Sequence, residues 1–185
     1  MRVLGISGSL RRDSHNRRLL AAAARALPAD VQFEEWSELE LIPPFNEDLD
    51  GDDAPAAVER MRAALSGADA ILIATPEYNH SIPGQLKNAL DWASRPFPDN
   101  ALRAKPVAVI GASTSLFGAV WAQAEVRKVL TAAGARPLDE ELPVASAQLA
   151  FEPDGELRDP AQQAALTEVI ARLLDEARVP VGAAA

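Results

Sequence analysis

The feature that most constrains the fold of this chain is a regular alternation of short apolar runs with longer helical patterns. Three runs of strand length are apolar throughout, at residues 3–6, 70–74 and 107–112. Strands that are covered on both faces have this composition, whereas strands with one wet face alternate between apolar and polar residues. The three runs are therefore expected to be the central strands of a parallel sheet.

Two weaker strands and five helices complete the pattern. Residues 31–36 alternate in polarity, as expected near a sheet edge, and residues 143–145 are a weak candidate for the opposite edge. Helical patterns separate the strands at residues 16–26, 54–65, 85–94, 119–132 and 160–177. Strands that alternate with helices of this length need right-handed crossovers, which place helices on both faces of the sheet. The sequence therefore predicts an α/β fold, a three-layer αβα, flavodoxin-like domain with a five-stranded parallel sheet of order 2-1-3-4-5.

The length of 185 residues and the hydrophobic fraction of 48% suit one domain. We expect it to span residues 1–180, with a long loop at residues 38–53 and a disordered tail at residues 181–185. The chain has no long apolar run typical of a membrane span, and it starts as a strand without a signal-peptide pattern. A cytoplasmic protein without membrane contact is the expectation.

Charge and composition exclude several classes of site. The net charge of −9 argues against nucleic-acid binding, which relies on basic surfaces. With no cysteine and two histidines, thiolate nucleophiles, disulfides and metal centres are not expected.

The acidity lies in one segment, since residues 30–59 hold eleven acidic and no basic residues. Residues 2–18 carry five arginines against one aspartate, which predicts a local anion site, although Arg17 and Arg18 could simply form the solvated face of a helix.

The loop after the first strand has the composition of a phosphate site. In open α/β sheets, ligands bind outside the carboxyl ends of the strands, near the point where the strand order reverses. Here Ser9, Arg11 and Ser14 lead into a helix N-terminus, whose free N–H groups and positive dipole attract anions. The alternative is that Ser14 or Asn16 only caps the helix.

The loops after the third and fourth strands suit a planar ligand. Residues 75–84 form a loop stiffened by Pro76 and Pro83, and Tyr78 offers an aromatic face. Residues 111–118 are mostly small, which permits close approach of a ligand. The chain lacks the motifs of nucleoside triphosphatases, dinucleotide folds and α/β-hydrolases. A non-standard serine hydrolase that pairs Ser7 or Ser9 with His15 or His80 stays open at this point.

Taken together, these loops resemble the NAD(P)H-dependent FMN reductase family, which includes bacterial quinone and chromate reductases. The most specific matches are Gly8-Ser9-Leu10-Arg11 with Ser14 and Asn16, and Pro76-Glu77-Tyr78-Asn79 with Ser81-Ile82-Pro83-Gly84 and Asp91-Trp92. The resemblance implies that the first motif holds the FMN phosphate, that residues 76–79 line the isoalloxazine ring, and that Ser113 contacts the flavin. The predicted cofactor-binding residues are Ser9, Arg11, Ser14, His15, Asn16, Pro76, Glu77, Tyr78, Asn79, Ser81, Ser113 and Gly118.

The resemblance also implies the chemistry and the partners. Hydride would pass from NADPH or NADH to FMN, and two electrons would then pass to a small acceptor such as a quinone, free flavin, an azo or nitro compound, or chromate. No protein side chain is expected to be catalytic, because the flavin carries the reaction. Preference for NADPH would require a cation for its 2′-phosphate, with Arg12 and Arg17 as candidates. A homodimer or homotetramer is implied as well.

Some features depart from the family pattern or fit another class. Ser115 and Phe117 stand where the family often has glycine, and Trp121 stands where a smaller or basic residue is expected. Trp121 is interpreted as a core or interface aromatic on a helix face.

The alternative function is a flavodoxin-like electron carrier that does not oxidise NAD(P)H, for which the acidic segment would serve as a docking face. Carriers of that type enclose the flavin between aromatic residues, and these loops offer only Tyr78 and Phe117.

Overall fold

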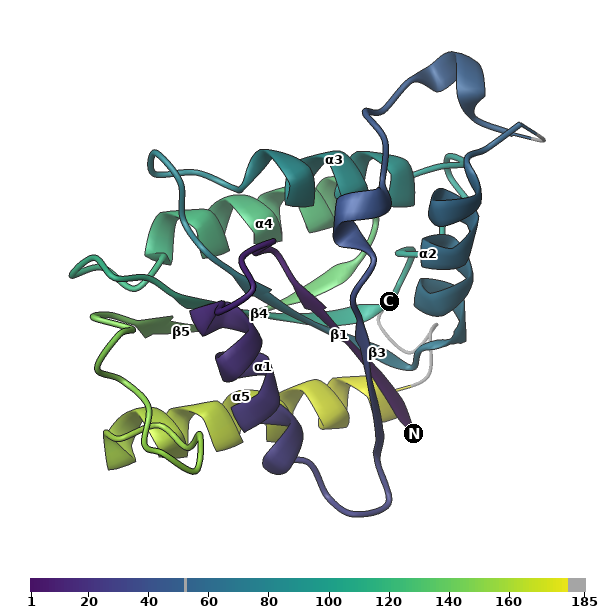
Figure 1. Cartoon of the computed structure of the whole chain (residues 1–185). Coiled ribbons are helices and arrows are strands. Elements are labelled where there is room, and N and C mark those ends of the chain that lie inside the picture. The colour runs from purple at the N-terminus through teal and green to yellow at the C-terminus, as the bar shows by residue number, and fades with distance from the viewer. Residues whose placement is uncertain (52, 180–185) are drawn as a thin grey trace.

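The computed structural model describes residues 1–51 and 53–179, and its centre is one five-stranded parallel sheet. The sheet order is β2-β1-β3-β4-β5, which confirms the predicted order 2-1-3-4-5 (Figure 1). The strands are β1 (Arg2–Ser7), β2 (Gln32–Trp36), β3 (Ala70–Thr75), β4 (Pro106–Ala112) and β5 (Arg136–Val144). The tail predicted at residues 181–185 lies outside the described residues.

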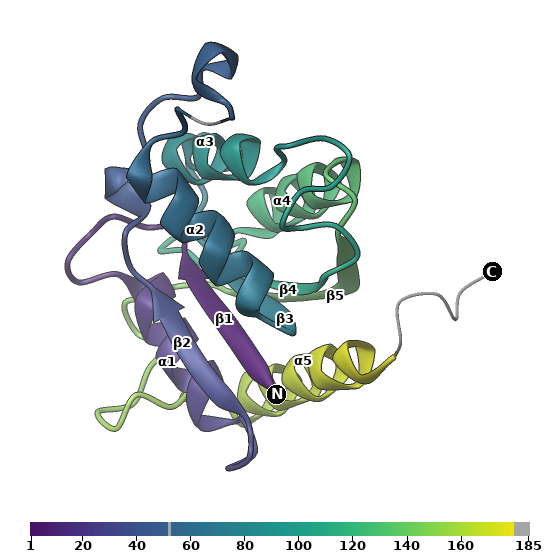
Figure 2. The same ribbon diagram turned by 90° about the vertical axis from the view of Figure 1, so that its right-hand side faces the viewer.

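Helices cover both faces of the sheet, so the predicted three layers are confirmed (Figures 1 and 2). One face carries α2 (Ala56–Gly67), α3 (Gly84–Ala93) and α4 (Val120–Ala132), and the other carries α1 (His15–Arg25) and α5 (Pro160–Arg178). Each face has its own apolar core: Leu4 and Ile6 of β1 belong to one, and Val3 belongs to the other. Successive strand residues point to opposite faces, which is why a strand between two cores must be apolar throughout.

The edge strand β5 corrects the prediction of a short strand at residues 143–145. It begins at Arg136, and most of it was missed because Pro137 and the acidic residues 139–141 interrupt the apolar pattern. An edge strand tolerates both features, since one side of its backbone has no partner strand. Leu138 and Leu142 are still buried. A register shift between Val107 and Val109 of β4 further disturbs the alternation along β5.

The segment at residues 38–51, within the predicted loop at residues 38–53, is more ordered than the plain loop that the sequence predicts. It contains two short 3₁₀ helices, η1 (Leu39–Leu41) and η2 (Glu47–Leu49). Side chains of α3 hold it in place: Gln85 Nε2 donates to the carbonyl oxygens of Leu39 and Ile42, both at 2.8 Å, and Asn88 Nδ2 and Trp92 Nε1 donate to that of Pro43. The segment therefore has a fixed position beside the carboxyl end of β2.

In the described part of the chain, no helix has the length and apolar character needed to cross a bilayer. Within the same residues, no three His, Asp or Glu side chains come together in a way that could hold a metal ion.

Candidate functional site

The loops that follow β1, β3 and β4 meet at the carboxyl edge of the sheet and enclose a cavity of about 100 Å³. We call it the carboxyl-edge cavity. Its lining residues come from all three loops and from the start of α1: Ser9, Arg11, Ser14, His15, Asn16, Pro76, Glu77, Tyr78, Ala112, Ser113 and Thr114. The fold therefore brings together residues that are more than a hundred positions apart in the chain.

Nine of the twelve residues predicted for the cofactor site line this cavity. Asn79, Ser81 and Gly118 are not among its lining residues, and Ala112 and Thr114 are lining residues that the sequence analysis missed. Ala112 has no chemical signature of its own. The available signal was its position at the carboxyl end of β4, because the other lining loops begin at the carboxyl ends of β1 and β3.

The start of α1 offers several hydrogen-bond donors that are not used within the protein. Ser14 caps the helix, since its Oγ accepts the N–H of Arg17 at 3.2 Å, and Ser9 Oγ accepts the N–H of Arg11 at 3.4 Å. Both serines are buried, yet neither hydroxyl donates to any residue that the structure describes. The backbone N–H groups of His15 and Asn16, in the first turn, likewise have no acceptor among the described residues. Such a group of donors suits an anion.

His15 adds an unsatisfied polar atom to the same place. Its Nδ1 is buried and has no hydrogen-bond partner among residues 1–51 and 53–179. Burial lowers the pKa of His15 below its ordinary value of 6.5, and the positive charges of Arg11 and Arg18 lower it further. The ring is therefore neutral at neutral pH, and a ligand in the cavity is the natural partner for its nitrogen.

Asn16 joins the first of these loops to the end of β4. Its Nδ2 donates to the carbonyl oxygen of Ala112, and its Oδ1 accepts the N–H of the same residue, both at 2.9 Å. Asn16 is only 3% exposed. Its side chain thus acts as a two-bond bridge that fixes the width of the carboxyl-edge cavity.

A tight turn explains why Asn79 and Ser81 do not line the cavity. The N–H of Tyr78 donates to the carbonyl oxygen of Ser81, and the N–H of Ser81 donates to that of Tyr78. Asn79 and His80 form the corner, with φ of 53° and 59°. Two consecutive positive φ values define a type I′ turn, in which asparagine is favoured. The turn leaves the Tyr78 ring beside the cavity and 49% exposed.

Glu77 has a structural role that the sequence did not reveal. Its Oε2 accepts the N–H groups of Trp121 and Ala122, at 3.0 and 3.1 Å. These bonds cap α4, because Ala119 at the N-cap position provides no side-chain acceptor. The ring of His80 packs edge-on against Trp121, with its Nδ1 at 3.6 Å from Glu77 Oε1. The loop after β3 is therefore fastened to α4.

Two further residues of interest lie between the end of β4 and the first turn of α4. The sequence predicts Trp121 to be a core or interface aromatic; it is 40% exposed, so the core alternative is wrong and the interface alternative stays a prediction. Gly118 has a φ of +59°, and a Cβ at this position would lie 2.5 Å from the carbonyl carbon of Pro143. Gly118 is thus required for close packing against the end of β5.

The comparisons with known proteins agree with this site. The family model described as NADPH-dependent FMN reductase matches residues 1–148. An NAD(P)H-dependent FMN reductase of Pseudomonas aeruginosa is 45% identical over 160 residues, which cover 86% of this chain and 85% of that protein. A 2-hydroxy-1,4-benzoquinone reductase of a Burkholderia species is 41% identical over 129 residues, or 70% and 69% of the two chains.

A solved structure gives the same result for the fold. The flavoenzyme NAD(P)H:(acceptor) oxidoreductase FerB from Paracoccus denitrificans superposes with a TM-score of 0.83 and 35% sequence identity, over 95% of this chain and 96% of that chain. The family model and the Pseudomonas aeruginosa relative are described as FMN reductases, and the superposed structure is that of a flavoenzyme with the fold described above. The chain therefore belongs to the NADPH-dependent FMN reductase family.

Proposed function

We propose that this protein binds FMN with the flavin phosphate in the carboxyl-edge cavity, and that it passes electrons from NAD(P)H to a quinone-like acceptor. The observation that carries the proposal is the set of unused donors at the start of α1. The hydroxyls of Ser9 and Ser14 and the N–H groups of His15 and Asn16 have no acceptor among the described residues, and Arg11 lines the same cavity. A phosphate group would satisfy these donors and match the positive end of the helix dipole.

The size of the cavity supports a division of the cofactor between two places. About 100 Å³ can take a phosphate group but not a whole flavin. The isoalloxazine ring would therefore lie outside the cavity, over Pro76 and beside the half-exposed ring of Tyr78. Pro76 and Tyr78 would then hold the ring, while the donors at the start of α1 would hold the phosphate.

When bound, FMN supplies the chemistry of hydride acceptance and onward electron transfer. The residues of the chain bind and orient it. Asn16 holds the first loop against the end of β4, and Glu77 holds the loop after β3 against α4. Both links fix the loops relative to each other, which keeps the phosphate site and the ring site at a constant separation.

The same geometry offers little support for the alternatives. An electron carrier that encloses its flavin between aromatic rings would need more than Tyr78 near the cavity, because Phe117 is not a lining residue. For a serine hydrolase, a serine hydroxyl should pair with a histidine. Among the described residues, no such hydrogen bond is present.

The choice of acceptor and the assembly belong to the proposal as well. A quinone is favoured as the acceptor because similar proteins of Burkholderia and Pseudomonas putida are named as quinone reductases. A homodimer or homotetramer is supported by the exposed apolar residues Leu116, Phe117 and Trp121 beside the site. We also propose that residues 1–180 form one FMN-binding domain and that it acts in the cytoplasm, where NAD(P)H is available.

The phosphate assignment can be tested by comparing FMN with riboflavin, which has the same ring but no phosphate. Several charge-assisted hydrogen bonds, each contributing about 1.5 to 3 kcal/mol, predict that FMN binds at least about 100-fold more tightly. Titration of the protein stripped of flavin, followed by flavin fluorescence, measures both affinities. Equal affinities would refute a phosphate site in the carboxyl-edge cavity.

The proposed acceptor is tested by measuring the oxidation of NADPH by the FMN-loaded protein with benzoquinone as the electron acceptor.

A further inference from the structure

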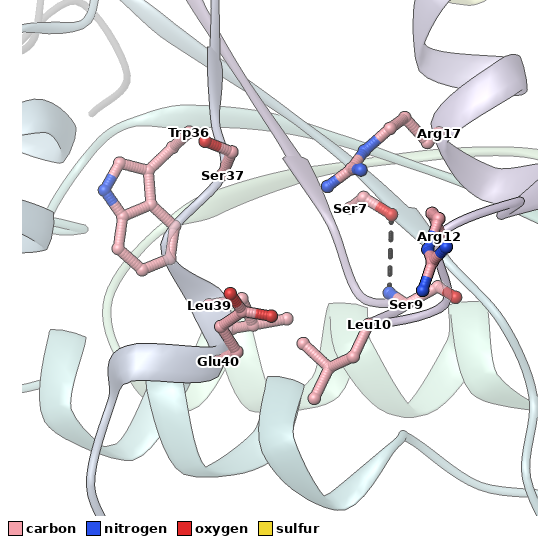
Figure 3. Close-up of a pocket in the computed structure, with 9 residues that line it drawn as sticks. All are labelled: Ser7, Ser9, Leu10, Arg12, Arg17, Trp36, Ser37, Leu39 and Glu40. Atoms are coloured by element: carbon pink, nitrogen blue, oxygen red, sulfur yellow. Dashed lines mark hydrogen bonds between the residues drawn. The ribbon is translucent and has the colours of Figure 1, made fainter.

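A second cavity lies on the other side of the first loop, between the carboxyl ends of β1 and β2 (Figure 3). We call it the β1–β2 cavity. Its volume is about 520 Å³, which is in the usual range for a small-molecule site. The residues that line it come from β1, the first loop, α1, the end of β2 and the segment after it: Ser7, Ser9, Leu10, Arg12, Arg17, Trp36, Ser37, Leu39 and Glu40.

The first loop separates this cavity from the proposed phosphate site. Arg11 lines the carboxyl-edge cavity, whereas its neighbours Leu10 and Arg12 line the β1–β2 cavity. Ser9 lines both. A long ligand with one end near the flavin can therefore reach the β1–β2 cavity by crossing a single loop.

One end of the β1–β2 cavity is cationic. Arg17 is held by its Nε, which donates to Glu35 Oε1 at 2.8 Å, and the described residues offer no acceptor to its terminal nitrogens. In Figure 3 its guanidinium group points into the cavity, above Ser7. Arg12 has no ion pair or side-chain hydrogen bond with any residue in the described part of the chain. The two guanidinium groups together offer an anion several charge-assisted donors.

The other end of the cavity is apolar and carries one carboxylate. The buried side chains of Trp36 and Leu39 line this end together with Leu10, which is half exposed. Figure 3 shows Glu40 on this side, across the cavity from the arginines. A flat apolar ring would pack against Trp36, and an amino group on that ring could donate to Glu40. The combination of a flat ring with an amino group and a separate phosphate describes an adenine nucleotide.

We infer that the β1–β2 cavity binds the 2′-phosphoadenosine end of NADPH, with Arg12 and Arg17 on the 2′-phosphate and the adenine against Trp36. This inference rests on the proposed function, because the nicotinamide end must then lie over the flavin beyond Ser9. Arg12 and Arg17 become the residues that determine cofactor specificity. The protein should accordingly prefer NADPH to NADH, which lacks the 2′-phosphate.

Steady-state kinetics of charge-removing variants provide the first test. Arg12→Gln and Arg17→Gln should each lower kcat/KM for NADPH by about tenfold or more through a higher KM, because each removes a charge-assisted contact. The values for NADH should stay within about twofold. The matched control is Arg60→Gln: like Arg17, Arg60 pairs with a glutamate, here Glu38, but it does not line the cavity. It should change neither value.

Direct binding to the FMN-loaded protein is the second test and does not depend on turnover. Calorimetric titration with adenosine 2′-phosphate should show binding that is lost in the Arg12→Gln/Arg17→Gln double variant and retained in Arg60→Gln. Equal binding to all three proteins, or an equal loss of NADPH and NADH activity in the double variant, would overturn the inference. FMN content and reduction by NADH are measured on the same samples. If they fail, the proposed function fails; if they hold while NADPH selectivity is unchanged, only the nucleotide site is wrong.

Discussion

Replacement of Asn16 by alanine should destabilise the protein by about 2 to 4 kcal/mol. The change removes both hydrogen bonds to Ala112 and leaves a buried N–H and a buried C=O without partners. Each such group costs about 1 to 3 kcal/mol, so the sum lies between about 2 and 6 kcal/mol. Water that enters from the adjoining carboxyl-edge cavity can satisfy part of this loss, which favours the lower half of the range. Urea unfolding of the flavin-free protein, followed by circular dichroism, measures the change.

Asn88→Ala is the matched control for this prediction. Asn88, on α3, forms a similar two-bond bridge to the segment after β2, since it accepts the N–H of Phe45 and donates to the carbonyl oxygen of Pro43, but it does not line the carboxyl-edge cavity. Both variants should lose stability, while only Asn16→Ala should also weaken FMN binding. An unfolding free energy of Asn16→Ala within about 0.5 kcal/mol of the wild-type value would refute the bridging role of this residue.

Three further predictions follow from the site. Arg11→Ala should weaken FMN binding by roughly 1.5 to 3 kcal/mol in a fluorescence titration, and an unchanged affinity would remove Arg11 from the phosphate site. Glu77→Ala should lower the thermal midpoint more than Glu77→Gln, which keeps an acceptor for the N–H groups of Trp121 and Ala122; equal midpoints would show that the cap is unimportant. Because the pKa of His15 is lowered in the folded state, the unfolded state binds the proton first as the pH falls below about 6.5. Stability should therefore fall in that range, less so in His15→Gln, and identical pH profiles would contradict the assignment.

The central strands and the layer order could be predicted because their physical cause is local. Residues 70–74 of β3 face the two cores in turn, so this run had to be apolar at every position. The edge strand β5 could not be found in the same way. Its outer residues are free to be charged, and the buried Leu138 and Leu142 are too few to show an alternation across the bulge.

The site shows the same division between local and long-range causes. The serines and Arg11 were found because a helix N-terminus and its donors are neighbours in sequence. The cap that Glu77 provides for α4 depends on residues 44 and 45 positions away, which only the fold brings together. The β1–β2 cavity likewise needs Trp36 and Glu40 to line the same space as Arg12, an arrangement of distant segments that the sequence does not reveal.

The most direct test of the account is anaerobic addition of NADPH to the FMN-loaded protein, with the oxidised-flavin absorption band followed over time. The account predicts rapid bleaching of the band and its recovery on addition of benzoquinone. Bound FMN that NADPH cannot reduce would contradict the reductase function and favour an electron carrier, and failure to bind FMN would contradict the assignment of all three loops.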